Sequence, residues 1–390
     1  MNQLRQTIEE EIRARGPVPF SRYMELCLYH PQFGYYSRHA AQFGKAGDFY
    51  TSSDVHAVFG RLMARQFDEM WRSLGSPSRI DVVEFGPGRG LFAQDVLDWS
   101  EQKFPEFFRA LRYVLSERSP ALRQRMRETL KRHLEAGKAT IEDKKGETSG
   151  AEAQPIRHAA GAAEVAPFQT IVFANEFFDA LPVDILSTQG SLRIDLNQGR
   201  LVETWATPSS QELEFLDRYS VHPEPGERVE VALAAQRHME EIASAIRRGF
   251  LIVIDYGYTR DEQLAGRHRG TLKAIRQHAI SASPYDAPGE QDITADVNFT
   301  ALAAAAGENG MLTHKLMTQS QFLMGIGEAT QFADAFEECR LPQERAKRAL
   351  QLKHLVTPAG MGESFHMLVA GKGIEPEEMS GLTGLGFARG

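Results

Sequence analysis

The sequence predicts an α/β fold built on a mainly parallel sheet, and three observations support this prediction. A short apolar run, Asp81–Phe85, ends at a glycine turn and is followed by a helix pattern. Strand candidates then alternate with helix candidates along the chain. The 390 residues, 42% apolar and 25% charged, are enough for one large domain with insertions or for two smaller domains. In such a sheet ligands bind at the carboxyl ends of the strands, where we expect the functional residues.

Composition limits the partners and the compartment. The net charge of −8 argues against a general binder of nucleic acid or of anionic membranes, although a local basic patch is compatible with it. The two cysteines, Cys27 and Cys339, are too few for a disulfide framework or a thiolate metal cluster. No apolar run is long enough to cross a bilayer, and the acidic N-terminus resembles neither a secretory signal nor a transit peptide. We therefore predict a soluble, cytoplasmic protein without a metal site.

Residues 1–77 are predicted to form an N-terminal helical segment and lid. Helix candidates cover Met1–Glu11 and Ser21–Leu28, and the second begins at an N-capping serine. The following residues up to position 52 are rich in aromatic rings and glycine. These rings either seal the segment onto the core or form a lid over a site. Asp48, flanked by glycine and rings, is the candidate functional residue among them.

The glycine turn is the most informative motif. An acid, Glu84, precedes glycines at alternate positions, Gly86, Gly88 and Gly90. Glycine permits positive φ and lets a ligand approach the backbone, and the next helix offers free N–H groups. A dinucleotide-binding G-x-G-x-x-G motif would need glycine where Leu91 stands, and no Walker motif occurs. The pattern E-x-G-x-G-x-G resembles the first motif of class I S-adenosylmethionine-dependent methyltransferases, the alternative being a turn that only lets strand and helix pack closely.

Residues 78–184 are predicted to form the first part of the core. After the glycine turn and its helix, Leu111–Glu117 is a second strand candidate that ends in an acid. A polar excursion around a short third strand follows, and Thr170–Ala174 is a buried fourth strand. Because this order is typical of a parallel sheet, Glu84 and Glu117 should lie at the same edge.

The remaining residues are predicted to complete the sheet around an insertion. Residues 185–228 alternate apolar and polar side chains, which indicates a small antiparallel insertion. Residues 229–373 hold the remainder of the core, with a fifth strand at Phe250–Asp255 and two late strands that bring the sheet to seven. The polar, glycine-bearing tail 374–390 is predicted to be disordered.

Six segments in this order resemble the MidA family of class I methyltransferases, and the similarity runs from about Pro17 to Gly371. The resemblance implies a Rossmann-like seven-stranded sheet with a family-specific insertion and S-adenosyl-L-methionine as cofactor. Mitochondrial members are protein arginine methyltransferases that modify a core subunit of respiratory complex I. The resemblance therefore implies a protein substrate, with a complex I subunit as a candidate, and the lack of a transit peptide indicates a bacterial relative. The segments are Gly47–Phe49, Glu84–Gly90, Ala174–Pro182, Ile254–Gly257, Asp292–Thr294 and Met361–Glu363.

The resemblance assigns the cofactor to Asp48, to the glycine turn and to two strand-end acids. Glu117 is placed to accept hydrogen bonds from both ribose hydroxyls, the alternative being a surface glutamate that pairs with a neighbouring arginine. Glu84 either holds the loop or binds the methionyl amine. The glycines Gly86, Gly88 and Gly90 let the cofactor touch the backbone.

Asn175 and Glu176 follow the fourth strand, where class I enzymes commonly bind the acceptor. A guanidinium has no easily lost proton near neutral pH, so a carboxylate that pins it by paired hydrogen bonds is the expected device. Glu176 fits that need. Asp179 either shares it or forms a turn or helix cap. The weaker candidates are Asp255, Tyr256, His278 and Asp292.

Other functions stay open at this point. A nucleic-acid base methyltransferase is disfavoured, because the sequence has neither an Asn-Pro-Pro-Tyr motif at the strand end nor a Pro-Cys nucleophile. A methyltransferase acting on a small molecule and a non-catalytic assembly factor that only binds the cofactor are both compatible with the sequence.

Overall fold

The computed structural model describes residues 3–38, 57–142, 169–277 and 279–387. The chain divides into two compact units, each assembled from separate stretches of sequence. The first unit comprises Met1–Phe49, Phe177–Met239 and Tyr256–Ala305, and the second comprises Tyr50–Glu176, Glu240–Asp255 and Ala306–Gly390. The helices α11 (Leu233–Ala245) and α13 (Phe299–Glu308) and the strand β10 (Gly249–Tyr258) run from one unit into the other.

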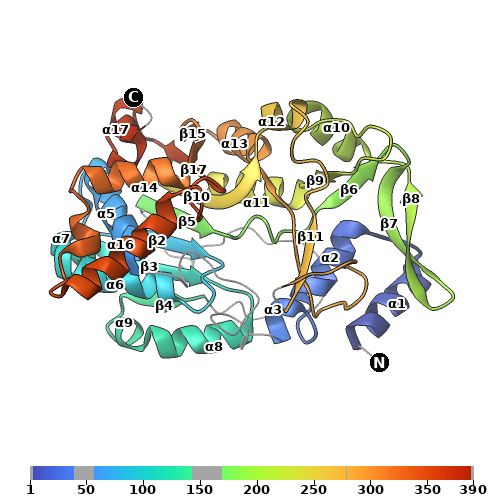
Figure 1. The fold of residues 1–390 in the computed structure, drawn as a ribbon, viewed down its shortest axis with the longest axis horizontal. Coiled ribbons are helices and arrows are strands. Elements are labelled where there is room, and N and C mark those ends of the chain that lie inside the picture. Colours follow the sequence, from blue (N-terminus) through green and yellow to red (C-terminus); the bar gives the residue numbers. More distant parts are fainter. Residues whose placement is uncertain (1–2, 39–56, 143–168, 278, 388–390) are drawn as a thin grey trace. The chain divides into compact units, whose positions relative to one another are not determined.

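The first unit contains short helices and two antiparallel sheets (Figure 1). In one sheet the order is β1-β7-β6-β9, with β8 paired to β7, and in the other it is β12-β11-β13. β14 pairs in parallel with the end of β10. The elements of the first unit are α1 (Gln3–Arg15), β1 (Val18–Pro19), α2 (Phe20–Tyr29), α3 (Tyr35–Arg38), β6 (Asp184–Ser187), β7 (Gly190–Asn197), β8 (Arg200–Ala206), α10 (Ser210–Tyr219), β9 (Val229–Val231), α12 (Arg260–Leu264), β11 (Lys273–Arg276), β12 (Ala279–Ile280), β13 (Asp292–Thr294) and β14 (Val297–Asn298).

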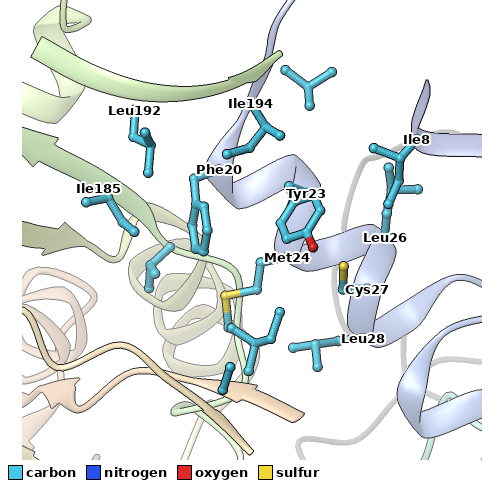
Figure 2. Packing of buried hydrophobic residues seen from close by; sticks show 14 of the residues in the cluster. Ile8, Phe20, Tyr23, Met24, Leu26, Cys27, Leu28, Ile185, Leu192 and Ile194 are labelled. Atoms are coloured by element: carbon cyan, nitrogen blue, oxygen red, sulfur yellow. The ribbon is translucent and has the colours of Figure 1, made fainter. Parts of the chain in front are cut away.

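The core of the first unit joins the N-terminal helices to the larger antiparallel sheet. α1 buries Leu4, Ile8 and Ile12, which recur every fourth residue and so share one helix face. Figure 2 shows side chains of α2, among them Tyr23 and Met24, packed among residues of β6 and β7. The strands predicted as an insertion therefore share a core with the N-terminal helices.

The second unit contains the large sheet. Seven strands follow the order β15-β17-β10-β5-β2-β3-β4, and β16 also pairs with β17. The pairs from β10 to β4 are all parallel. Its elements are α5 (Ala57–Ser73), β2 (Ile80–Phe85), α6 (Leu91–Lys103), α7 (Pro105–Ala110), β3 (Leu111–Ser116), α8 (Pro120–Thr129), α9 (Lys131–Glu135), β4 (Ala139–Ile141), β5 (Gln169–Asn175), β15 (Leu312–Thr313), β16 (Met317–Thr318), α14 (Gln319–Glu328), α15 (Ala333–Phe336), α16 (Pro342–Val356), β17 (Phe365–Lys372), α17 (Pro376–Ser380) and α18 (Thr383–Gly386).

Aromatic packing fixes α5 and α6 against the large sheet. The ring of Phe92 on α6 stacks on Phe173 of β5 with centroids 4.4 Å apart, and Phe67 of α5 meets Phe173 edge-on at 5.8 Å. All three side chains are buried. Because α6 begins directly after the glycine turn, this packing holds the turn in place at the end of β2.

The predicted α/β fold with a mainly parallel sheet is confirmed. The third strand of the prediction falls in residues 143–168, outside the described part, while the strand next to β3 is the short β4. In the tail, where disorder is predicted, the structure has α17 and α18, and Thr383 donates its hydroxyl to Glu69 of α5 at 2.8 Å. No helix in the described part of the chain is both long and apolar enough to span a membrane.

Candidate functional site

The carboxyl ends of three parallel strands lie level with one another in the second unit. Phe85 of β2 pairs with Ser116 of β3 on one side and with Ala174 of β5 on the other. The residues that directly follow these strands therefore share one edge of the sheet. They include the glycine turn, Glu117 and the Asn175–Glu176 pair, as predicted for a ligand site of a parallel sheet.

The glycine turn has the backbone conformation that requires glycine. Gly86, Gly88 and Gly90 have φ values of 62°, 54° and 76°, all in the left-handed region. The N–H of Gly86 donates to the carbonyl of Ser116 at 3.2 Å, which ties the turn to the end of β3. A Cβ at Gly88 would meet no other described residue within 4 Å. Internal crowding therefore does not explain glycine at this position, and the open space suits the approach of a ligand.

Glu117 is held beside the glycine turn by main-chain donors. Its carboxylate accepts the N–H of Ser119 at 2.8 Å. Burial raises the pKa of Glu117 to about 7, although main-chain N–H groups, including that of Gly88, favour the charged form. The predicted alternative to cofactor binding is pairing with an arginine. Arg123 donates to the main-chain carbonyl of Glu117 at 2.9 Å, and its charge also favours the ionised form of the Glu117 carboxylate.

Glu84 is the second-last residue of strand β2, directly before the edge of the sheet that carries the glycine turn. It is buried and accepts a hydrogen bond from the hydroxyl of Tyr113, on the neighbouring strand, at 2.8 Å. Burial raises the pKa of Glu84 to about 8, and the nearby carboxylate of Glu117 adds to the rise while Tyr113 opposes it. Both predicted roles of Glu84, holding the turn and binding the methionyl amine, stay predictions.

Asn175 and Glu176 form a strained corner at the end of β5. Glu176 has a φ of 51°, a conformation that is uncommon outside glycine and often marks functional sites. Its N–H donates to Ile254 of β10 at 2.9 Å, and its carboxylate accepts the Asn175 side-chain amide at 3.1 Å. The buried Oδ1 of Asn175 has no hydrogen-bond partner among the described residues. This oxygen is available to a donor on a ligand.

These residues fit S-adenosyl-L-methionine. The turn has open space at Gly88, Glu117 offers a carboxylate beside it, and Asn175 offers a buried acceptor on the same edge. Asp48, the other predicted cofactor ligand, lies outside the described residues, as does His278.

Asp179 belongs to the first unit, where it is buried. The hydroxyl of Tyr256 donates to its carboxylate, and its main-chain carbonyl accepts the N–H of Ala295 at 3.0 Å. Burial raises the pKa of Asp179, although Tyr256 and the N–H of Ala180 favour its charged form. The contact with its own loop agrees with the predicted turn-forming role, and the contact with Tyr256 adds a partner that the sequence did not indicate.

A second tyrosine–carboxylate pair lies in the same unit. Tyr36 of α3 donates its hydroxyl to buried Asp292 of β13 at 2.8 Å. Tyr29 packs its ring 5.5 Å from that of Tyr36 and donates to the carbonyl of Ala180 at 2.9 Å. The nearby carboxylate of Asp179 contributes to raising the pKa of Tyr36, for which burial is the main cause. The sequence predicts that the rings around Tyr36 either seal the N-terminal segment onto the core or form a lid, and no local signal connects Tyr36 to Asp292.

Asp255 ends the part of β10 in the second unit and is fully buried. No group of three or more His, Cys, Asp or Glu side chains within the described residues is arranged to hold a metal ion.

Comparisons with known proteins extend these observations. A family model described as "Putative S-adenosyl-L-methionine-dependent methyltransferase" matches residues 62–317. The chain is 29% identical to the mitochondrial protein arginine methyltransferase NDUFAF7 homolog of Drosophila melanogaster, over 99% of this chain and 88% of that protein. It is 30% identical to the mitochondrial protein arginine methyltransferase NDUFAF7 of Danio rerio, over 92% of this chain and 84% of that protein.

Two solved structures from Burkholderia thailandensis share the fold. One is a COG1565 superfamily member bound to S-adenosyl-homocysteine, with a TM-score of 0.77 and 26% identity over 99% of this chain and 95% of that chain. The other is a native COG1565 superfamily protein, with a TM-score of 0.79 and 27% identity over 99% and 94% of the two chains.

Proposed function

The chain belongs to this family of S-adenosyl-L-methionine-dependent methyltransferases, and from that premise we propose that it methylates an arginine side chain of a protein. The enzyme class and the cofactor predicted from the sequence are confirmed by the family match. The choice of arginine is supported by the names of the relatives from Drosophila melanogaster and Danio rerio, which are protein arginine methyltransferases.

The observation that carries the proposal is the strained corner at the end of β5. Glu176 presents a carboxylate at the same sheet edge as the glycine turn and Glu117, and Asn175 binds that carboxylate through its amide. A planar guanidinium pairs with a carboxylate through two parallel hydrogen bonds, so Glu176 suits arginine better than a hydroxyl or a thiol. The left-handed backbone at Glu176 is uncommon for a residue other than glycine and is typical of functional sites.

The role proposed for each site residue follows from its position at this edge of the sheet. When bound, S-adenosyl-L-methionine would supply an electrophilic methyl group on a sulfonium to a guanidinium nitrogen, with S-adenosyl-homocysteine as the leaving group. Glu117 holds the ribose and the glycine turn admits the cofactor to the backbone, so that the methyl is positioned. Glu176 orients the guanidinium and takes the proton that leaves the methylated nitrogen. The hydrogen bond from Tyr256 to Asp179 is proposed to stabilise the conformation of the loop after Glu176.

The test is transfer of a labelled methyl group from S-adenosyl-L-methionine to proteins in an extract of cells that lack this protein. The wild-type protein should label a defined band on arginine. Glu176→Gln keeps the side-chain shape but removes the charge, so transfer should fall roughly hundredfold while cofactor affinity stays within about twofold. Glu142 follows β4, the strand at the end of the sheet next to β3, and Glu142→Gln should change neither quantity.

Each outcome of this test has a distinct meaning. Label on another residue type would overturn the arginine assignment. Full transfer by Glu176→Gln would remove this residue from the mechanism. Cofactor binding without any transfer by the wild-type protein would favour the non-catalytic assembly factor.

A respiratory complex I subunit is the proposed protein substrate, on the basis of the family resemblance.

We also propose that the protein works in a reducing compartment such as the cytoplasm, because Cys27 and Cys339 are both free thiols.

A further inference from the structure

The helix α16 carries cations that form no ion pair within the described part of the chain. Lys347 and Lys353 are exposed, and neither forms an ion pair with a described residue, whereas the guanidinium of Arg345 lies over the ring of Phe336 at 4.8 Å. The only acid on the helix is Glu344. Its carboxylate instead accepts main-chain N–H groups at the start of the helix, from Arg340 at 2.9 Å and Leu341 at 3.1 Å. The helix therefore presents positive charge on a chain whose net charge is −8.

The helix α1 provides a contrast of similar length. Its three arginines, Arg5, Arg13 and Arg15, each lie four residues from a glutamate and within 4.0 Å of its carboxylate. Such ion pairs within the helix stabilise a charged surface helix without any partner molecule. On α16 the single glutamate, Glu344, lies four residues before Arg348, and neither Lys347 nor Lys353 has an acid four residues away, so the charges of these two lysines are available to a partner.

An exposed leucine lies among these cations. Lys347, Leu350 and Lys353 recur every third residue, which places them on one face of α16. Leu350 is 69% exposed. The opposite face buries Leu352 and Leu355, where α16 packs against its own unit on α5, α14 and α15 (Figure 1). The outward face thus offers one ammonium group on either side of an apolar side chain.

We infer that this face of α16 docks an acidic segment of a partner protein that carries carboxylates beside a large apolar side chain. Carboxylates complement the unpaired cations, and an apolar side chain would cover Leu350. A membrane-surface helix would need a continuous apolar face toward the lipid, but the buried leucines of α16 face its own unit. A single-stranded nucleic-acid site would use large aromatic side chains for stacking, and α16 has no Phe, Tyr or Trp. The inference does not depend on arginine being the methylated residue.

The test uses the full chain and a fluorescent peptide of about 20 residues in which glutamates alternate with leucines. Anisotropy should show binding that weakens as salt rises from about 50 to about 300 mM. Lys347→Glu/Lys353→Glu should weaken binding at least tenfold, and Leu350→Ser should weaken it severalfold. A peptide with glutamine in place of glutamate should not bind.

The matched control is Arg237→Glu/Lys315→Glu, because both of these residues are also exposed and outside the ion pairs of the described chain. It changes the net charge by the same amount as the α16 variant. The inference predicts that it binds the peptide within about twofold of wild type. Equal loss in both variants, or no peptide binding by the wild type, would overturn the inference. Tighter α16-dependent binding to vesicles with about 30% phosphatidylserine, or to an oligonucleotide, would also overturn it.

Discussion

Each compact unit contains a tyrosine that donates its hydroxyl to a buried carboxylate at 2.8 Å, but the two pairs are built differently. In the second unit Tyr113 and Glu84 are 29 residues apart and lie on the adjacent strands β3 and β2. In the first unit Tyr36 and Asp292 are 256 residues apart and lie on α3 and β13. The same chemical contact is thus made once by neighbouring strands and once by distant segments.

The difference shows which part of a site can be predicted from local pattern. Two consecutive strands of a parallel sheet have a register that brings their final residues level, so acids at those ends meet wherever the strands are recognised. The pair Tyr36–Asp292 depends on the complete path of the first unit, for which neither residue carries a periodic signal. We propose that the local acids serve the cofactor and that the distant pair stabilises its own unit.

The largest expected effect tests the local acids. Glu117→Ala removes the carboxylate proposed to accept two ribose hydroxyls, each bond being worth about 1.5 kcal/mol or more. Affinity for S-adenosyl-L-methionine should therefore fall roughly hundredfold, measured by calorimetry. Glu142→Ala, at the end of the next strand, is the matched control and should bind normally. If Glu117→Ala lowered the affinity for S-adenosyl-L-methionine less than about threefold, the ribose would bind elsewhere. The proposal that the local acids serve the cofactor would then be wrong.

The fold was predictable to the extent that it follows from short repeating patterns. The apolar strand at 80–85, the glycine turn and the helix after it have the predicted order because each has its own periodicity or turn chemistry. The core shared by α1, α2 and β7 was not predicted, since it joins segments far apart in sequence. The prediction also did not foresee that residues after 374 form helices, because polar and glycine-bearing composition is typical of disordered tails.

The candidate site divides in the same way. Glu117 and Asn175–Glu176 could be selected because they directly follow recognisable strands. The left-handed backbone of Glu176 could not be predicted, because a glutamate has no preference for positive φ. The partnership of Asp179 with Tyr256 links a loop to a strand 77 residues away, and only the folded chain brings them together. The roles of all these residues stay predictions that the variants test.

A second, smaller effect is the pH dependence of cofactor affinity. The pKa of Glu117 in the folded protein is about 7, so its carboxyl group is mostly neutral at pH 6 and mostly ionised at pH 8. A carboxylate accepts the ribose hydroxyls better than a carboxylic acid does. Affinity should therefore fall about tenfold from pH 8 to pH 6, because the ionised fraction of a group with a pKa of about 7 falls from about 0.9 to about 0.1 over this range.

The sign of the stability effect is opposite. Because folding raises the pKa of Glu117 from its ordinary 4.5, the group favours folding below pH 4.5 and this contribution is lost as the pH rises to about 7. Titrations of affinity and of urea unfolding should thus move in opposite directions between pH 6 and pH 8. Glu117→Gln should flatten the affinity profile, whereas Tyr36→Phe should leave it unchanged. A pH dependence that persists in Glu117→Gln would assign it to another group.

The smallest expected effect compares the two tyrosines directly. Tyr36→Phe and Tyr113→Phe each remove one hydroxyl donor from a buried carboxyl group, and each should lower the free energy of unfolding by about 1 kcal/mol. The cost of Tyr113→Phe should depend on pH. Burial raises the pKa of Glu84 to about 8, and Tyr113 opposes this rise by donating to the ionised form. Loss of the donor therefore raises that pKa further from its ordinary 4.5, so ionising Glu84 costs more in the variant.

Urea unfolding at about pH 6 and about pH 9 should show a larger loss of stability in Tyr113→Phe at the higher pH, since charged hydrogen bonds are roughly twice as strong as neutral ones. An equal cost at both pH values would mean that Glu84 stays in one protonation state, and its proposed place beside the cofactor turn would need a different electrostatic account.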